Sequence, residues 1–209
     1  VSVTGTIYLQ SGLINTSVSK SLIFSGTDIF SPLNQFGETN AGWENSFING
    51  PMKWETNIAT TQNIPIGKNA VFAPVKMQKI NAGFARYLLE YFPSPYLSLI
   101  PVASPPLDHI SKIEYWEIKA DPASVSPEAN IGLSWRPGSG EDSTIADQND
   151  LRIAQFEDRG TGLRWEELGG PNQTNLNGQY GQILSSQLMT NFSVYTLASA
   201  SKLNILPIS

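Results

Sequence analysis

A chain of 209 residues with 40% apolar residues can bury a core, as one large β domain or two small ones. The formal net charge of −5, without a basic stripe in either half, argues against nucleic acid as a partner, and no apolar run is long enough to span a membrane. Cysteine is absent, which excludes disulfides and thiolate metal sites. The chain begins without Met or a leader, so we expect a mature fragment.

Residues 1–30 contain short apolar segments separated by small turns, at Val3–Leu9, Leu13–Thr16 and Ser21–Phe24. Strands this short cannot bury a face alone, so they must stack on something else. Glycines between them fit two arrangements, the last rungs of a β-solenoid or a small sheet of hairpins. The sequence leaves both open.

Asn49-Gly50-Pro51 separates the apolar segments Ser46–Ile48 and Met52–Trp54, after an expected loop over residues 31–45. Asn-Gly is a strong signal for a tight turn. The proline that follows disfavours an ordinary hairpin, because proline cannot donate a ladder hydrogen bond. We therefore expect a turn here and leave the pairing of its flanks open.

A second break at Ile64–Gly67 sets a predicted boundary, with a short-strand β region over residues 1–68 and a β-sandwich over residues 69–209. About eight strands, each followed by turn residues, are typical of an immunoglobulin-like or jelly-roll sandwich. The fold class is therefore all-β. The expected strands are Val71–Ile80, Arg86–Phe92, Lys112–Lys119, Asn130–Trp135, Leu151–Phe156, Leu163–Trp165, Gly181–Ser185 and Ser193–Leu197.

No catalytic constellation can be assembled from the sequence. His109 is the one histidine, and Asp108, as its direct neighbour, is poorly placed to orient the imidazole ring as a Ser-His-Asp triad requires. Glu114 and Glu117 have an odd separation on an expected strand, which puts them on opposite faces. The sequence therefore predicts no enzyme, no catalytic residue and no cofactor.

An acidic loop offers one metal hypothesis. Asp142, Asp147 and Asp150 carry oxygens of the type that calcium uses. Their spacing does not match an EF-hand loop, so a solvated loop without metal is the favoured interpretation.

The five tryptophans divide into two groups. Trp116 and Trp135 lie in strand patterns and are expected in the core. Trp43 and Trp54 lie in turn-rich segments and are the candidates for a ligand surface, where an indole ring can stack on a sugar.

A series of short motifs follows one order along the chain. They are Ser46-Phe-Ile-Asn-Gly-Pro-Met52, Ile64-Pro-Ile-Gly67, Phe72-Ala-Pro-Val75, Glu90-Tyr-Phe-Pro93, Leu107-Asp-His-Ile-Ser-Lys-Ile-Glu-Tyr-Trp-Glu-Ile118, Ile131-Gly-Leu-Ser-Trp135, Asp150-Leu-Arg-Ile-Ala154 and Phe192-Ser-Val-Tyr-Thr-Leu197. Over about residues 3–198 the chain resembles a non-catalytic β module of large surface proteins exported by the type IX secretion system in Bacteroidota.

The resemblance implies an extracellular or cell-surface location and a place after repetitive β regions in a long protein, with no established ligand. The chain departs from such proteins because it ends at Ser209 without a recognisable sorting domain, so we expect either a fragment or export that depends on other parts of the protein. Asp142-Ser143-Thr144 matches the short O-glycosylation signal of this bacterial group, so Ser143 is a candidate for a surface glycan.

The favoured function is a structural or adhesive module of a cell-surface or secreted assembly, including filamentous ones. Its expected partners are other copies of itself or neighbouring domains, and at least one strand edge in residues 1–30 is expected to be completed by a neighbouring chain or a preceding rung. The alternative is a carbohydrate-binding module attached to a secreted enzyme, with polysaccharide as its partner.

Overall fold

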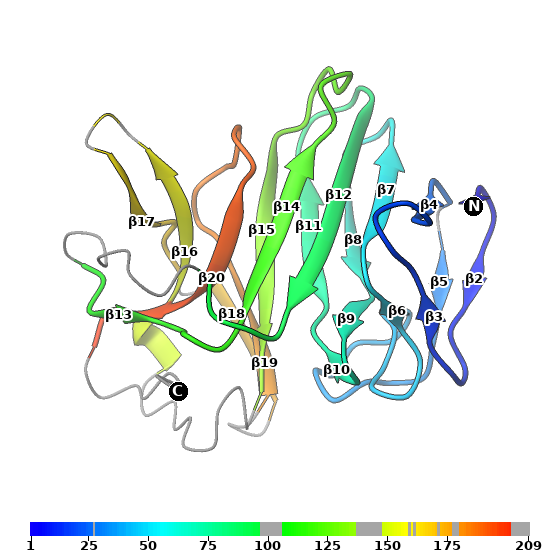
Figure 1. Ribbon diagram of the computed structural model, residues 1–209, viewed down its shortest axis with the longest axis horizontal. Helices are drawn as coiled ribbons and strands as arrows, with labels where there is room; N and C mark the ends of the chain where they lie inside the picture. Colours follow the sequence, from blue (N-terminus) through cyan, green and yellow to red (C-terminus); the bar gives the residue numbers. More distant parts are fainter. Residues whose placement is uncertain are drawn as a thin grey trace.

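The computed structural model of this chain describes residues 1–26, 28–96, 106–136, 148–158, 160, 162–170, 172–176 and 180–201. These residues form an all-β protein with several open sheets, which confirms the predicted fold class (Figure 1). Their one helical element is the 3-10 turn η1 (Gln148–Asp150). Nothing helical in these ranges has the length and apolarity that crossing a membrane requires.

The largest sheet has nine strands and extends across the molecule (Figure 1). In spatial order they are β1 (Ser2–Val3), β4 (Leu22–Phe24), β7 (Met52–Thr56), β12 (Ala85–Phe92), β14 (Tyr115–Ala120), β20 (Val194–Ser199), β16 (Leu151–Asp158) and β17 (Leu163–Glu167), with β13 (His109–Ile110) on β20. β1, β4 and β7 are parallel, and the remaining neighbours are antiparallel. Side chains of β12 alternate between buried and half-buried, which gives the sheet an inner and an outer face.

A five-stranded antiparallel sheet packs on the inner face of the first. Its order is β18 (Asn172–Leu176), β19 (Tyr180–Leu184), β15 (Ala129–Trp135), β11 (Val75–Lys79) and β8 (Thr60–Ile64). Side chains of both sheets form one apolar core. Trp116 and Trp135 are 0% and 2% exposed in it, which confirms their predicted burial.

Residues 2–49 make two successive passes that lie one on the other. The first pass comprises β1, β2 (Ile7–Tyr8) and β3 (Ile14–Asn15), and the second comprises β4, β5 (Ile29–Phe30) and β6 (Ile48–Asn49). Each first-pass strand pairs in parallel with its counterpart in the second pass. β7 and β9 (Ile66–Lys68) extend two of the three stacks, and β10 (Val71–Phe72) pairs with β9.

The passes share the main core with the two large sheets. Leu9, Phe24 and Ile48 are at most 1% exposed and belong to the same cluster as Trp116. The loop over residues 31–46, inserted between β5 and β6, also contacts the five-stranded sheet through the ion pair between Glu38 and Lys76 (2.6 Å). The parallel end is thus held to the antiparallel end by burial as well as by pairing.

The structure resolves the pairing that the sequence left open at residues 49–51 and corrects one expected strand. Asn49-Gly50-Pro51 forms a turn, but its flanks β6 and β7 belong to different sheets, so it is a corner between sheets. Gly50 has φ 126° and a Cβ there would lie 2.6 Å from the Thr16 carbonyl oxygen, which explains the glycine. The predicted strand Val71–Ile80 is divided at Pro74, which has no N–H to donate. The boundary expected near residue 68 stays a prediction. Pairing of β7 with β12 and of β8 with β11 links strands on either side of that residue.

Candidate functional site

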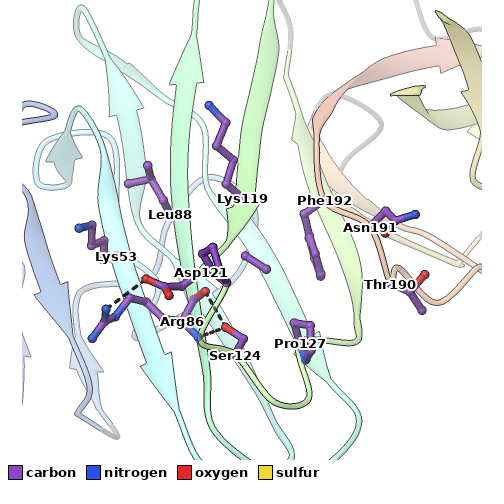
Figure 2. A pocket seen from close by; sticks show the side chains of 12 residues that line it. Lys53, Arg86, Leu88, Lys119, Asp121, Ser124, Pro127, Thr190, Asn191 and Phe192 are labelled. Atoms are coloured by element: carbon purple, nitrogen blue, oxygen red, sulfur yellow. Dashed lines mark hydrogen bonds and ion pairs between the residues drawn. The ribbon is translucent and has the colours of Figure 1, made fainter. Parts of the chain in front are cut away.

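A groove of about 700 Å³ opens on the outer face of the nine-stranded sheet (Figure 2). Strand register places a row of three side chains along it, with Leu88 of β12 between Lys53 of β7 and Lys119 of β14. Residues 190–192 form part of the opposite side. We call this feature the outer groove, and its volume is within the range of small-ligand sites, about 300–1,000 Å³.

Arg86 lies in the next row of the outer groove and is already paired. Its guanidinium donates to the carboxylate of Glu55. It also donates to the carboxylate of Asp121 at 3.2 Å (Figure 2). The hydrogen bond to Glu55 is the main cause that raises the pKa of Arg86. The backbone N–H of Ala123 is the main cause that lowers the pKa of Asp121. This charge cluster therefore fixes the wall of the outer groove and, with one guanidinium against two carboxylates, leaves no positive charge of Arg86 for a ligand.

The two lysines give the outer groove its remaining positive charge. Lys119 pairs with Glu117 at 2.9 Å but is 56% exposed, so this pair is weak. Lys53 has no ion-pair partner among the described residues. Phe192 adds an aromatic ring, held edge-on against Tyr87 with the ring centroids 5.3 Å apart. The outer groove thus combines ammonium groups with apolar surface.

A second candidate site is the open strand edge of the first pass. The N–H groups of Ile7 and Leu9 donate to the second pass at 3.2 and 2.7 Å, so the N–H of Tyr8 between them points the opposite way. The same holds for Asn15, whose two neighbours donate to the second pass. Within the described ranges, β1, β2 and β3 each pair with one strand. Their other side offers backbone groups for a further strand.

Matching side chains are stacked between the passes. Tyr8 and Phe30 have ring centroids 5.3 Å apart with an interplanar angle of 17°. Asn49 Nδ2 donates to Asn15 Oδ1 at 2.7 Å, and the N–H of Asn69 donates to Asn49 Oδ1 at 3.1 Å. Such aromatic and asparagine ladders form where like residues stack in register on parallel strands.

Glycines mark a further close approach between the passes. A Cβ at Gly26 would collide with the carbonyl oxygen of Gly5, whereas a Cβ at Gly5 would meet no atom within 4 Å. The first pass therefore requires glycine at position 26, whereas Gly5 faces open space.

The two tryptophans proposed for ligand binding have structural roles. Trp54 is 1% exposed and stacks on Tyr87 at 5.5 Å between centroids, so its ring is not accessible. The expectation that Trp54 is exposed is therefore wrong, because β7 is a central strand and Trp54 lies on its inner face. Trp43 is half-buried, and its Nε1 donates to the Leu9 carbonyl at 3.1 Å, which ties the inserted loop to the first pass.

The metal and glycan hypotheses fall mostly on other residues. Asp142, Asp147 and Ser143 lie outside the described residues. Asp150 ends η1, and its carbonyl accepts the N–H of Ala200 at 2.8 Å. Within the described residues there is no group of three or more carboxylates or histidines that could hold a metal ion. Calcium binding and glycosylation stay predictions.

His109 contacts its sequence neighbour. Its Nδ1 lies 2.9 Å from Asp108 Oδ2, so the expectation that Asp108 is poorly placed to orient the ring is wrong. Asp108 precedes β13, which begins at His109, so the alternation of side chains along a strand does not force the two onto opposite faces. The pair orients an imidazole but is not by itself a catalytic device.

A buried ion pair was missed by the sequence reasoning. Glu114 Oε2 accepts from Arg136 Nη2 at 2.6 Å and from the Tyr91 hydroxyl at 2.8 Å, and the Glu114 side chain is fully buried. Burial, more than the charge of Glu114, raises the pKa of Tyr91. Glu117 lies on the outer face, so it and Glu114 are separated as predicted. The one sequence signal for this pair is Arg136, which directly follows the apolar strand β15.

Comparison of the chain with protein-family models, with curated proteins and with solved structures gives no significant match.

Proposed function

We propose that this protein is a non-catalytic structural or adhesive module of a bacterial cell-surface or secreted assembly, joined to its neighbours through the first pass. In this proposal the two passes are the end of a β-solenoid, and the two facing sheets are an immunoglobulin-like or jelly-roll sandwich. The partners are neighbouring domains or other copies of the chain. Nucleic acid, membrane insertion and cofactors have no part in it.

The open edge of the first pass is the observation that carries the proposal. Outward N–H groups at Tyr8 and Asn15 lie on short strands whose other side is already paired. An exposed strand edge is a template for pairing with another strand, and main-chain hydrogen bonds then provide the affinity.

Charge pairing supports a role without catalysis. Glu55, Glu114 and Glu167 each pair with an arginine, so these carboxylates are committed to the structure. General acid–base catalysis would need a carboxyl group free to exchange a proton with a substrate. The sequence resemblance to surface modules points the same way.

Edge pairing can be tested by removing its donors. With no other partner present, two isolated copies are expected to associate weakly through their edges, in a concentration-dependent way. The double variant Tyr8→Pro with Asn15→Pro lacks the outward N–H groups and should be monomeric in sedimentation analysis.

Val18→Pro is the matched control, because Val18 lies in the turn after β3, where proline is tolerated. It should associate as the parent does. A parent that stays monomeric at every concentration, or an edge variant that associates equally, would contradict the proposal.

The outer groove favours a second function, the carbohydrate-binding module. Ammonium groups at Lys53 and Lys119 beside apolar Leu88 suit an acidic polysaccharide, whose carboxylates and ring faces match them. The double variant Lys53→Met with Lys119→Met should weaken binding of a uronic-acid polysaccharide by about tenfold or more in calorimetry. Lys20→Met, outside the groove, is the control, and equal loss in both variants would count against this function.

A further inference from the structure

We infer that the open edge of the first pass binds one more parallel pass. The added pass carries a glycine, an aromatic residue and an asparagine in register with Gly5, Tyr8 and Asn15. The inference rests on the proposed function and names the chemistry of the partner. A polypeptide with this pattern is the occupant that the edge fits.

Register between the existing passes supports a parallel partner. Ile7 lies opposite Ile29 and Tyr8 opposite Phe30, so residues of one kind are stacked on the same kind. The third stack repeats this over three strands, with Ile14, Ile48 and Ile66 in line. Parallel, in-register stacking keeps each kind of side chain in its own column, and an additional pass would continue the columns.

The aromatic column ends at an uncovered ring. Phe30 covers one face of Tyr8, while Tyr8 remains 66% exposed against 43% for Phe30. Exposure increases toward the open edge, as expected at the end of a stack. An aromatic ring in the next pass would cover Tyr8 as Tyr8 covers Phe30, with a gain in both buried area and ring contact.

The asparagine column has a direction. Asn49 donates from its Nδ2 to the Oδ1 of Asn15, in the earlier pass. Continued in the same sense, Asn15 Nδ2 donates to the pass that precedes it, and no acceptor for this nitrogen is present among the described residues. An asparagine Oδ1 at the matching position supplies that acceptor.

The glycine column sets a steric requirement. Gly26 has no room for a Cβ because the Gly5 carbonyl lies above it, and the strands β1 and β4 that precede these glycines are in register. An added pass at the same spacing brings its own carbonyl over Gly5. Only glycine then fits at position 5, although nothing near it now requires one.

A second copy of this chain fits the edge less well. Two first passes related by a twofold axis would meet antiparallel, and the three columns would then be out of register. Antiparallel pairing of two copies uses the backbone groups alone.

The test adds a pass to the full chain. Ser2 pairs with Ile23, 21 residues later, so a copy of residues 1–21 fused directly before Val1 places its glycine, tyrosine and asparagine in register. The parent part keeps its own core, so the fused segment either stacks or remains free. The same segment with those three residues replaced by alanine is the matched control.

Stacking should raise the melting temperature by roughly 4 °C or more, and slow hydrogen exchange at the Tyr8 and Asn15 N–H groups by about tenfold or more. The alanine control should do neither. Gly5→Ala should leave the unfused chain unchanged and remove the gain from the fusion.

Unchanged exchange at Tyr8 and Asn15 in the fusion overturns the inference, and so does an equal gain from the alanine control. A fusion that stacks while the native chain fails to associate through its edge would instead overturn the proposed function and leave the inference standing.

Discussion

The two ends of the molecule satisfy their backbone hydrogen bonds in different ways. At the antiparallel end, the strands are long. β12 and β16 have eight residues each and pair with antiparallel neighbours on both sides. At the parallel end, strands of two or three residues are stacked on their counterparts from another pass. Long ladders stabilise the first kind, whereas stacked columns and side chains buried in the shared core stabilise the second.

This difference affects how an additional strand could pair at each end of the molecule. Antiparallel edges such as β17 pair by backbone alone, and any register shift moves side chains to the other face. The first pass presents columns that define the register of an incoming strand in advance. The assembly that we propose through the parallel end would therefore be the more specific of the two.

The largest expected effect tests whether the two ends unfold together. Trp54→Ala should lower the free energy of unfolding by about 3–5 kcal/mol, because Trp54 belongs to the core that both ends share. A single denaturant transition, followed by near- and far-ultraviolet circular dichroism, should persist. Ile58→Ala, at an exposed position, should stay within about 0.5 kcal/mol of the parent. Two separate transitions would show that the ends are independent.

The next largest effect compares the stability cost of a substitution inside the parallel end with that of the same substitution at its edge. Gly26→Ala should destabilise the protein by about 1–3 kcal/mol, since its Cβ meets the Gly5 carbonyl. Gly5→Ala should change the free energy of unfolding by less than about 0.5 kcal/mol, because its Cβ enters open space. Similar losses from both substitutions in chemical denaturation would mean that Gly5 is already covered.

The stability of the antiparallel end should depend on pH in the alkaline range. Burial raises the pKa values of Tyr87, Tyr91 and Tyr195 in the folded state. A folded pKa above the unfolded value, about 10, means that this stability is complete below pH 10 and is lost as the pH rises further. The melting temperature should therefore fall above about pH 10, together with a delayed increase in tyrosinate absorbance. Full ionisation of all tyrosines near pH 10 without unfolding would contradict this assignment.

The smallest effect is on the exposed aromatic stack. Tyr8→Ala should cost less than about 1 kcal/mol, because Tyr8 loses one ring contact while its other face is already in solvent. Thermal melting measures the loss, and Phe24→Ala in the adjacent interior is the contrasting variant, with about 3–5 kcal/mol expected. A large loss from Tyr8→Ala would indicate that the stack holds the pass in place.

Long strands were predictable from alternation, and short ones were not. The expected strand Arg86–Phe92 differs from β12 by one residue, because its inward and outward side chains alternate throughout. β18, with the sequence Asn-Gln-Thr-Asn-Leu, has no apolar alternation and was missed. The parallel passes were hidden because the inserted loop changes the spacing, from 21 residues between Ser2 and Ile23 to 34 between Ile14 and Ile48.

The candidate sites depend on register that no sequence pattern encodes. Lys53, Leu88 and Lys119 meet in the outer groove because three strands from distant parts of the chain align. Trp54 was expected to be exposed because its surroundings are rich in turns, but the strand it belongs to is central. Local composition predicts turns well and says little about which sheet follows them.

Hydrogen exchange at the first pass tests the central claim most directly. At low protein concentration the N–H groups of Tyr8 and Asn15 should exchange rapidly, while those of Ile7 and Ile14, bonded to the second pass, are protected. As the concentration rises and edges pair, Tyr8 and Asn15 should become protected while Ile7 and Ile14 change little. Exchange at Tyr8 and Asn15 that is slow in the monomer, or equally fast at every concentration, would contradict a joining role for this edge.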